Sequence, residues 1–129
     1  MSKDDKKPNS VLLVDDDEFI RDIYSTKLAE AGIHIAVTED GKKALDILKE
    51  EHFDVILVDI IMPNVNGIEL LKKLGERENM EDTKVIVLSN QGQPRDIDKA
   101  EEFDIDGYII KANHVPSEVL DEITSVYNQ

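Results

Sequence analysis

The sequence predicts an α/β fold, a doubly wound five-stranded parallel sheet with helices on both faces. Five short apolar runs typical of strands recur along the chain, at residues 11–14, 33–38, 55–58, 84–88 and 105–110. Helical patterns lie between them, and this alternation is the signature of the β–α–β units that build parallel sheets. A chain of 129 residues also has the size of one domain.

The first and last helical segments have the clearest signals. After the first strand, one apolar face is formed by Ile20, Ile23, Tyr24, Leu28 and Ala31. Asp17 is placed to cap this helix, and Gly32 is placed to end it. Pro116 opens the last helix in a favoured first-turn position. Three more helices are expected, one from Gly41, one over about 65–74 and one from near Pro94.

The polarity of the strands predicts their order in the sheet. The first, third and fourth strands are continuously apolar, as strands covered on both faces should be. Polar residues interrupt the second and fifth strands, which are therefore expected at the edges. With right-handed crossovers, this favours the order 2-1-3-4-5. Ligands in such a sheet bind beyond the carboxyl ends of the strands, at the switch point between the first and third strands.

Composition excludes several classes of function. The chain has 15 Lys and Arg, 29 Asp and Glu, and a net charge of −14, so contact with a nucleic-acid backbone would be repulsive. No apolar run approaches the roughly 20 residues that a membrane span needs. Residues 1–10 are polar and lack the apolar stretch of a secretory signal. We expect a cytoplasmic protein with a disordered tail over 1–10 and one domain over 11–129.

Acidic residues follow two neighbouring strands at the switch point. Asp15, Asp16 and Asp17 come directly after the first strand, and Asp59 follows the third. Converging carboxylates repel each other unless a hard divalent cation joins them, and Mg²⁺ prefers oxygen ligands. The alternative is that these acids only cap helices. That interpretation suits Asp17, whereas the other three predict a magnesium site.

Two further polar residues end strands at the same rim. Ser89 ends the fourth strand and Lys111 ends the fifth. Beside a metal–carboxylate cluster, a hydroxyl and an ammonium can bind phosphoryl oxygens. The set predicts a site where an aspartate carboxylate attacks phosphorus.

The sequence resembles the receiver domain of two-component response regulators over residues 11–127. The resemblance rests on VLLVDD at 11–16, DVILVDIIMP at 54–63, VIVLS at 85–89 and GYIIK at 107–111. It implies a flavodoxin-like fold and, for this chain, a single-domain regulator similar to those of chemotaxis.

The resemblance also implies a role for each site residue. Asp59 would be the phosphoacceptor, and Mg²⁺ would be bound by Asp16, Asp59 and the backbone carbonyl of Ile61, with Asp15 acting through a water. Lys111 would contact the phosphoryl group.

Ser89 and Tyr108 would form the conformational switch. Spacing alone would make Tyr108 an ordinary half-exposed aromatic of an edge strand.

The resemblance implies a signalling module rather than an enzyme, with only self-catalysed phosphotransfer and slow autodephosphorylation. A histidine kinase or phosphotransfer protein would phosphorylate it, as a monomer or a phosphorylation-dependent dimer. The chain ends with its fifth helix, so output is expected through a protein target that binds the fourth helix, fifth strand and fifth helix.

Two alternatives remain. One is a haloacid dehalogenase-type phosphatase with Asp15 as nucleophile and Asp17 as acid, which leaves Asp59 unexplained. The other is a degenerate receiver that acts as a constitutive interaction domain, against which the complete set of acids, Ser89 and Lys111 argues.

Overall fold

The predicted fold class is confirmed. The computed structural model describes residues 6–59, 67–76, 82–89, 102–103, 105–110 and 115–129. Five parallel strands form one sheet in the order β2-β1-β3-β4-β5. They are β1 (Ser10–Val14), β2 (His34–Thr38), β3 (Val55–Asp59), β4 (Lys84–Ser89) and β5 (Gly107–Ile110). The two strands predicted at the edges, β2 and β5, lie there.

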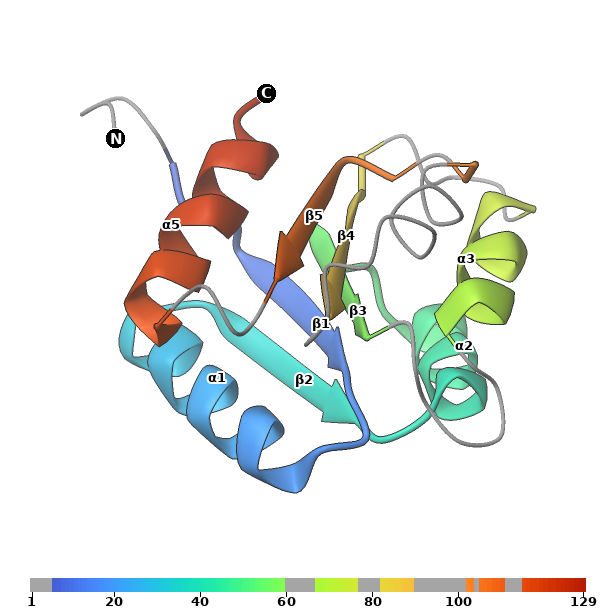
Figure 1. Cartoon of the computed structure of the whole chain (residues 1–129), viewed down its shortest axis with the longest axis horizontal. Helices are drawn as coiled ribbons and strands as arrows, with labels where there is room; N and C mark the ends of the chain where they lie inside the picture. The colour runs from blue at the N-terminus through green and yellow to red at the C-terminus, as the bar shows by residue number, and fades with distance from the viewer. Residues whose placement is uncertain (1–5, 60–66, 77–81, 90–101, 104, 111–114) are drawn as a thin grey trace.

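Helices cover both faces of the sheet (Figure 1). One face carries α1 (Glu18–Glu30) and α5 (Pro116–Tyr127), and the other carries α2 (Gly41–Glu50) and α3 (Gly67–Gly75). The helix expected from near Pro94 lies outside the described residues. Among the described residues, no helix has the length and apolar character needed to cross a bilayer.

The apolar strands supply two cores because their side chains alternate between the faces. Leu12, Val14, Ile56, Val58, Val85 and Val87 pack on the α2–α3 side. Val11, Leu13, Val55, Leu57, Ile86 and Leu88 pack on the α1–α5 side. Burial of one such side chain contributes roughly 1.5–3 kcal/mol. The continuous apolar pattern of the inner strands therefore has a direct cause in the fold.

The expected ends of α1 are confirmed. The Asp17 side chain accepts hydrogen bonds from the backbone N–H groups of Phe19 and Ile20, so Asp17 is the N-cap. Gly32 follows the helix with φ of 84°, a left-handed conformation that glycine adopts without steric cost. Asp17 caps α1 three residues after the end of β1, so the acidic residues 15–17 form the turn between the two elements.

Some predicted boundaries shift by one or two residues. β1 begins at Ser10 and β5 begins at Gly107, two residues later than expected. In that gap, the Asp106 carboxylate accepts a hydrogen bond of 2.8 Å from the N–H of Val85. At Gly107, an added Cβ would lie 3.0 Å from Cγ2 of Val126, so glycine lets α5 approach the sheet.

The start of the chain contacts the end of α5. The Lys6 N–H donates to Oδ1 of Asn128, whose Nδ2 donates to the Lys6 carbonyl. The Asn9 carbonyl accepts a bond of 2.9 Å from the N–H of His34. The division into a disordered tail at 1–10 and a domain at 11–129 stays a prediction.

Candidate functional site

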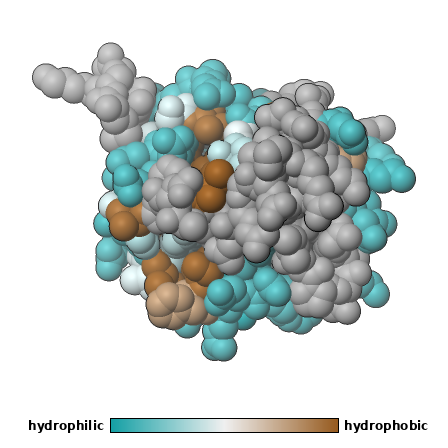
Figure 2. Space-filling model, viewed as in Figure 1, coloured by the Kyte–Doolittle hydropathy of each residue, from teal (hydrophilic) through white to brown (hydrophobic). Residues whose placement is uncertain are grey.

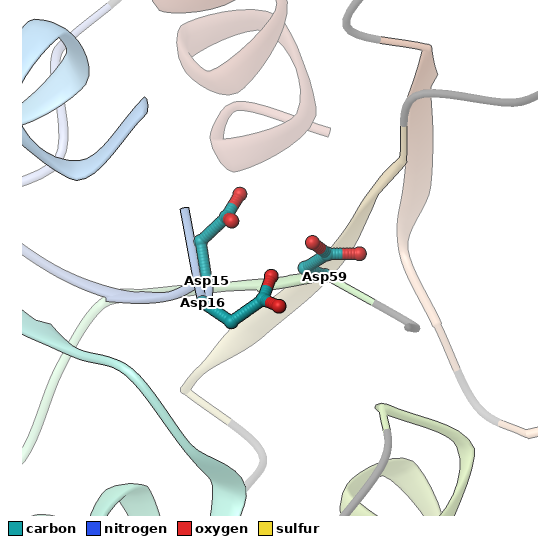
Figure 3. Close-up of side chains that lie close together, drawn as sticks. All are labelled: Asp15, Asp16 and Asp59. Atoms are coloured by element: carbon teal, nitrogen blue, oxygen red, sulfur yellow. The ribbon is translucent and has the colours of Figure 1, made fainter. Parts of the chain in front are cut away.

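Three carboxylates meet at the carboxyl ends of β1 and β3. Val14 of β1 pairs with Val58 of β3, so the next residues, Asp15 and Asp59, lie at the same level. One carboxylate oxygen from each of Asp15, Asp16 and Asp59 lies within 4.8 Å of the others. Figure 3 shows the three carboxylates around the space between the strand ends. The expected convergence at the switch point is therefore present in the structure.

The three acids differ in burial. Asp15 is fully buried and Asp59 is 7% exposed, whereas Asp16 is exposed. Asp15 is oriented locally, because its Oδ1 accepts a hydrogen bond of 2.9 Å from the N–H of Asp17. Its own N–H donates to the Thr38 carbonyl at the end of β2. Among the three carboxylates, Asp16 is therefore the one that solvent reaches most directly.

The donor atoms fit a hard divalent cation. All three are carboxylate oxygens, which Mg²⁺ prefers, and Mg²⁺ usually keeps several waters beside one or two carboxylates. Carboxylates this close repel each other, and a bound cation would offset that repulsion. Asp17 is not in this group, since its side chain caps α1. The cluster is thus suited to hold a hard divalent cation.

The other predicted site residues are described in part. Ser89 is the last residue of β4, next to β3, but its side chain lies outside the described part of the structure. Lys111 and Ile61 also lie outside the described residues. Tyr108 is in β5 opposite Val87, half-buried against the core on the α2–α3 side.

A groove lies along α1, next to the start of α5. It has a volume of about 520 Å³ and is lined by Phe19, Asp22, Ile23, Thr26, Lys27, Glu30 and Pro116. Phe19 is 69% exposed, and Val115, next to Pro116, is 56% exposed. Figure 2 shows apolar atoms gathered on the side of the molecule formed by α1 and α5. Apolar side chains exposed together are typical of surfaces that bind other proteins.

One contact at the site was not predicted from sequence. Nη1 of Arg21 donates a hydrogen bond of 2.8 Å to the backbone carbonyl of Asp15. The two residues lie on either side of a turn and a helix cap, so their contact depends on the path of the chain between them. The one signal in the sequence was that Arg21 lies near the start of α1, only six residues after Asp15.

Comparisons with known proteins agree with this geometry. The model of the family described as response regulator receiver domain matches residues 11–123. The chain is 36% identical over 103 residues to the transcriptional regulatory protein CpxR of Escherichia coli, covering 80% of this chain and 43% of CpxR. It is 35% identical over 116 residues to the chemotaxis protein CheY of Halobacterium salinarum, covering 90% of this chain and 94% of that protein.

A solved structure has the same fold. The chemotaxis response regulator CheY4 of Vibrio cholerae superposes with a TM-score of 0.84 at 28% identity, covering 91% of this chain and 97% of that one. The chain spans less than half the length of CpxR, whereas it spans nearly all of the two chemotaxis proteins.

Proposed function

Because this chain belongs to the family of response regulator receiver domains, we propose that it is a signalling module controlled by phosphorylation of Asp59. The observation that carries the proposal is the gathering of the Asp15, Asp16 and Asp59 carboxylates within 4.8 Å at the switch point of the sheet. Asp59 ends the central strand β3, where a donor molecule can approach from beyond the sheet.

The proposed reaction is a direct phosphoryl transfer. A carboxylate oxygen of Asp59 forms a bond to phosphorus while the donor's bond to phosphorus breaks, and the bonding pair leaves with the donor as imidazole or acetate. When Mg²⁺ is bound, it neutralises charge on the phosphoryl oxygens. Asp16, Asp59 and the Ile61 carbonyl would hold the cation, with Asp15 acting mainly through a water. Lys111 contacts a phosphoryl oxygen from β5's end.

We further propose that Ser89 and Tyr108 transmit the change. The Ser89 hydroxyl follows a phosphoryl oxygen and favours one conformation of the neighbouring loop, and Tyr108 repacks with it. Tyr108 is half-buried, packed against the core on the α2–α3 side. Output would be binding of a protein target to the face that includes β5 and α5. The segment expected to form the fourth helix of that face lies outside the described residues.

The wider setting is also a proposal. A histidine kinase or phosphotransfer protein would supply the phosphoryl group in the cytoplasm, and the module would act as a monomer or a phosphorylation-dependent dimer. The phosphatase alternative is not favoured, because the receiver family model covers residues 11–123 and the Asp17 carboxylate is occupied as a helix cap.

The test of this function is phosphorylation by a small donor. The protein is incubated with acetyl phosphate in the presence of Mg²⁺ or of EDTA, and its intact mass is measured. We expect one phosphoryl group to be added with Mg²⁺ and almost none with EDTA. Equal labelling in both solutions would contradict a metal-assisted transfer.

The groove on α1 leads to a prediction about the protein donor. Phe19 lies three residues after Asp16, so a protein that covers the acidic rim will contact its exposed ring. Phe19→Ser should therefore slow transfer from a phosphorylated donor protein by about tenfold, the effect of losing one buried aromatic anchor. Labelling by acetyl phosphate should be unchanged, because that donor needs no protein surface.

The matched control for this experiment is Val37→Ser on the edge strand β2. Val37 is also an exposed apolar residue, at 41%, but it does not line the groove. Val37→Ser should leave transfer from the donor protein and from acetyl phosphate unchanged. If Phe19→Ser lost transfer from both acetyl phosphate and the donor protein, or from neither, the groove would have no specific role in recognising the donor protein.

The lifetime of the phosphoryl group gives another prediction. Hydrolysis needs a water held in line with phosphorus by a polar side chain. By the family resemblance, the positions that reach this water are Ile61 and Gln91, and Ile61 cannot hydrogen-bond it. We expect a long-lived phosphorylated state, with Ile61→Asn decaying faster than the wild type and Gln91→Ala slower or unchanged.

The measurement follows the loss of the phosphoryl group from the labelled protein over time, after the donor is removed. Ile61→Val keeps an apolar side chain and should decay as slowly as the wild type. A wild type that decays as fast as Ile61→Asn would show that Ile61 does not limit hydrolysis.

A further inference from the structure

The peptide group between Asp15 and Asp16 is held by a side chain from α1. The Asp15 carbonyl oxygen belongs to the peptide bond that joins these two acids. It accepts a hydrogen bond of 2.8 Å from Nη1 of Arg21, a part-buried contact. A charged donor makes such a bond stronger than a neutral one. The orientation of this peptide sets where the Asp16 side chain leaves the backbone.

The other contacts of this turn fix Asp15 rather than Asp16. The Asp15 N–H donates to the Thr38 carbonyl, and the Asp15 carboxylate accepts from the Asp17 N–H. Asp16 is exposed, so packing restrains its side chain least among the three acids. The bond from Arg21 is a side-chain contact that acts on the peptide directly before Asp16.

The Arg21 guanidinium is directed to a carbonyl rather than to an acid. Within the described part of the chain, the recorded ion pairs do not include Arg21. Its charge still acts at the rim. A hydrogen bond from Lys43 lowers the pKa of Glu39, and the nearby charge of Arg21 lowers it further. The hydrogen bond to the Asp15 carbonyl places this cationic group beside the site where we propose that Mg²⁺ binds.

We propose that Arg21 is a positioning residue for the cation site, which holds the Asp15–Asp16 peptide so that the Asp16 carboxylate faces Asp15 and Asp59. This inference rests on the proposed function. Two effects of Arg21 on Mg²⁺ binding have opposite signs. Its charge repels a second cation, so removing the charge should tighten binding. Its hydrogen bond orients a ligand, so removing the bond should weaken binding, and contacts behind a metal ligand are typically worth about 10- to 100-fold in affinity.

The experiment measures Mg²⁺ affinity by calorimetry for the full chain and its variants, without phosphodonor. Arg21→Ala should bind Mg²⁺ about tenfold more weakly than the wild type. Arg21→Gln, which loses the charge but keeps an N–H donor, should bind more tightly than Arg21→Ala. Lys27→Ala removes a positive charge farther along the same helix and should leave the affinity unchanged or slightly tighter.

The outcomes separate the inference from the proposed function. A wild type that binds no Mg²⁺ would overturn the cation site itself. A wild type that binds, with Arg21→Ala equal to it or tighter, would overturn only the role of Arg21. Thermal melts in EDTA identify the folded variants. If Arg21→Ala does not fold, the inference depends on Arg21→Met, which keeps most of the side-chain length but has no donor. It should bind Mg²⁺ more weakly than the wild type, and unchanged or tighter affinity would overturn the inference.

Discussion

Asp59→Asn is expected to abolish phosphorylation by acetyl phosphate. The substitution keeps the size of a side chain that is 7% exposed at the end of β3, so the fold should be retained. An amide oxygen is a far weaker nucleophile than a carboxylate, and the variant also removes one ligand of the proposed cation site. Intact mass spectrometry should show no added phosphoryl group under conditions that label the wild type fully.

Asp17→Asn is the matched control for Asp59→Asn. It is the same chemical change at the same rim, but Asp17 caps α1 and asparagine is an equally good N-cap. This variant should be labelled like the wild type. Normal labelling of Asp59→Asn would show that the acceptor is misassigned, and loss of labelling in Asp15→Asn alone would favour the phosphatase alternative.

Asp16→Asn should raise the melting temperature of the metal-free protein and weaken Mg²⁺ binding. Three carboxylate oxygens lie within 4.8 Å of one another. At such separations, two like charges repel by about 1 kcal/mol in water and about 3 kcal/mol at an effective dielectric constant of about 20. Asp16 is exposed, so the smaller value applies. A gain of about 1 kcal/mol corresponds to a rise of roughly 4 °C for a domain of this size.

Melting in EDTA and in Mg²⁺ tests this prediction. Mg²⁺ should stabilise the wild type by mass action, and Asp16→Asn should gain much less from it. Asp121→Asn, an exposed change on α5, controls for the general effect of reducing a net charge of −14. A wild type whose melting temperature does not change in millimolar Mg²⁺ would count against the cation site.

The sheet could be predicted from sequence because the apolar pattern of its inner strands follows directly from their burial. Inner strands such as Val55–Asp59 are covered on both faces, so both alternating sets of side chains must be apolar. The placement of Asp15 and Asp59 followed from the strand order, since the carboxyl ends of parallel neighbours meet at one edge. The family of the chain was recognised from the same residues and is shown by the match over 11–123.

Other features depend on contacts that no local pattern contains. The contact between Arg21 and the Asp15 carbonyl needs the exact path of the turn that Asp17 caps. Just before β5, the backbone N–H and the side chain of Asp106 both bond to Val85 of a different strand, a contact between residues far apart in the sequence. The roles of Ser89, Lys111 and Ile61 stay predictions, because the structure describes the side chain of none of them.

The most direct test of the account is to locate the phosphoryl group in the wild type. The protein is labelled with acetyl phosphate and Mg²⁺, and the acyl phosphate is reduced with borohydride, which converts the modified aspartate to homoserine. Peptide mass spectrometry then identifies the residue. We expect conversion at Asp59 alone, with Asp15 and Asp16 unchanged. Conversion at Asp15 with Asp59 intact would contradict it.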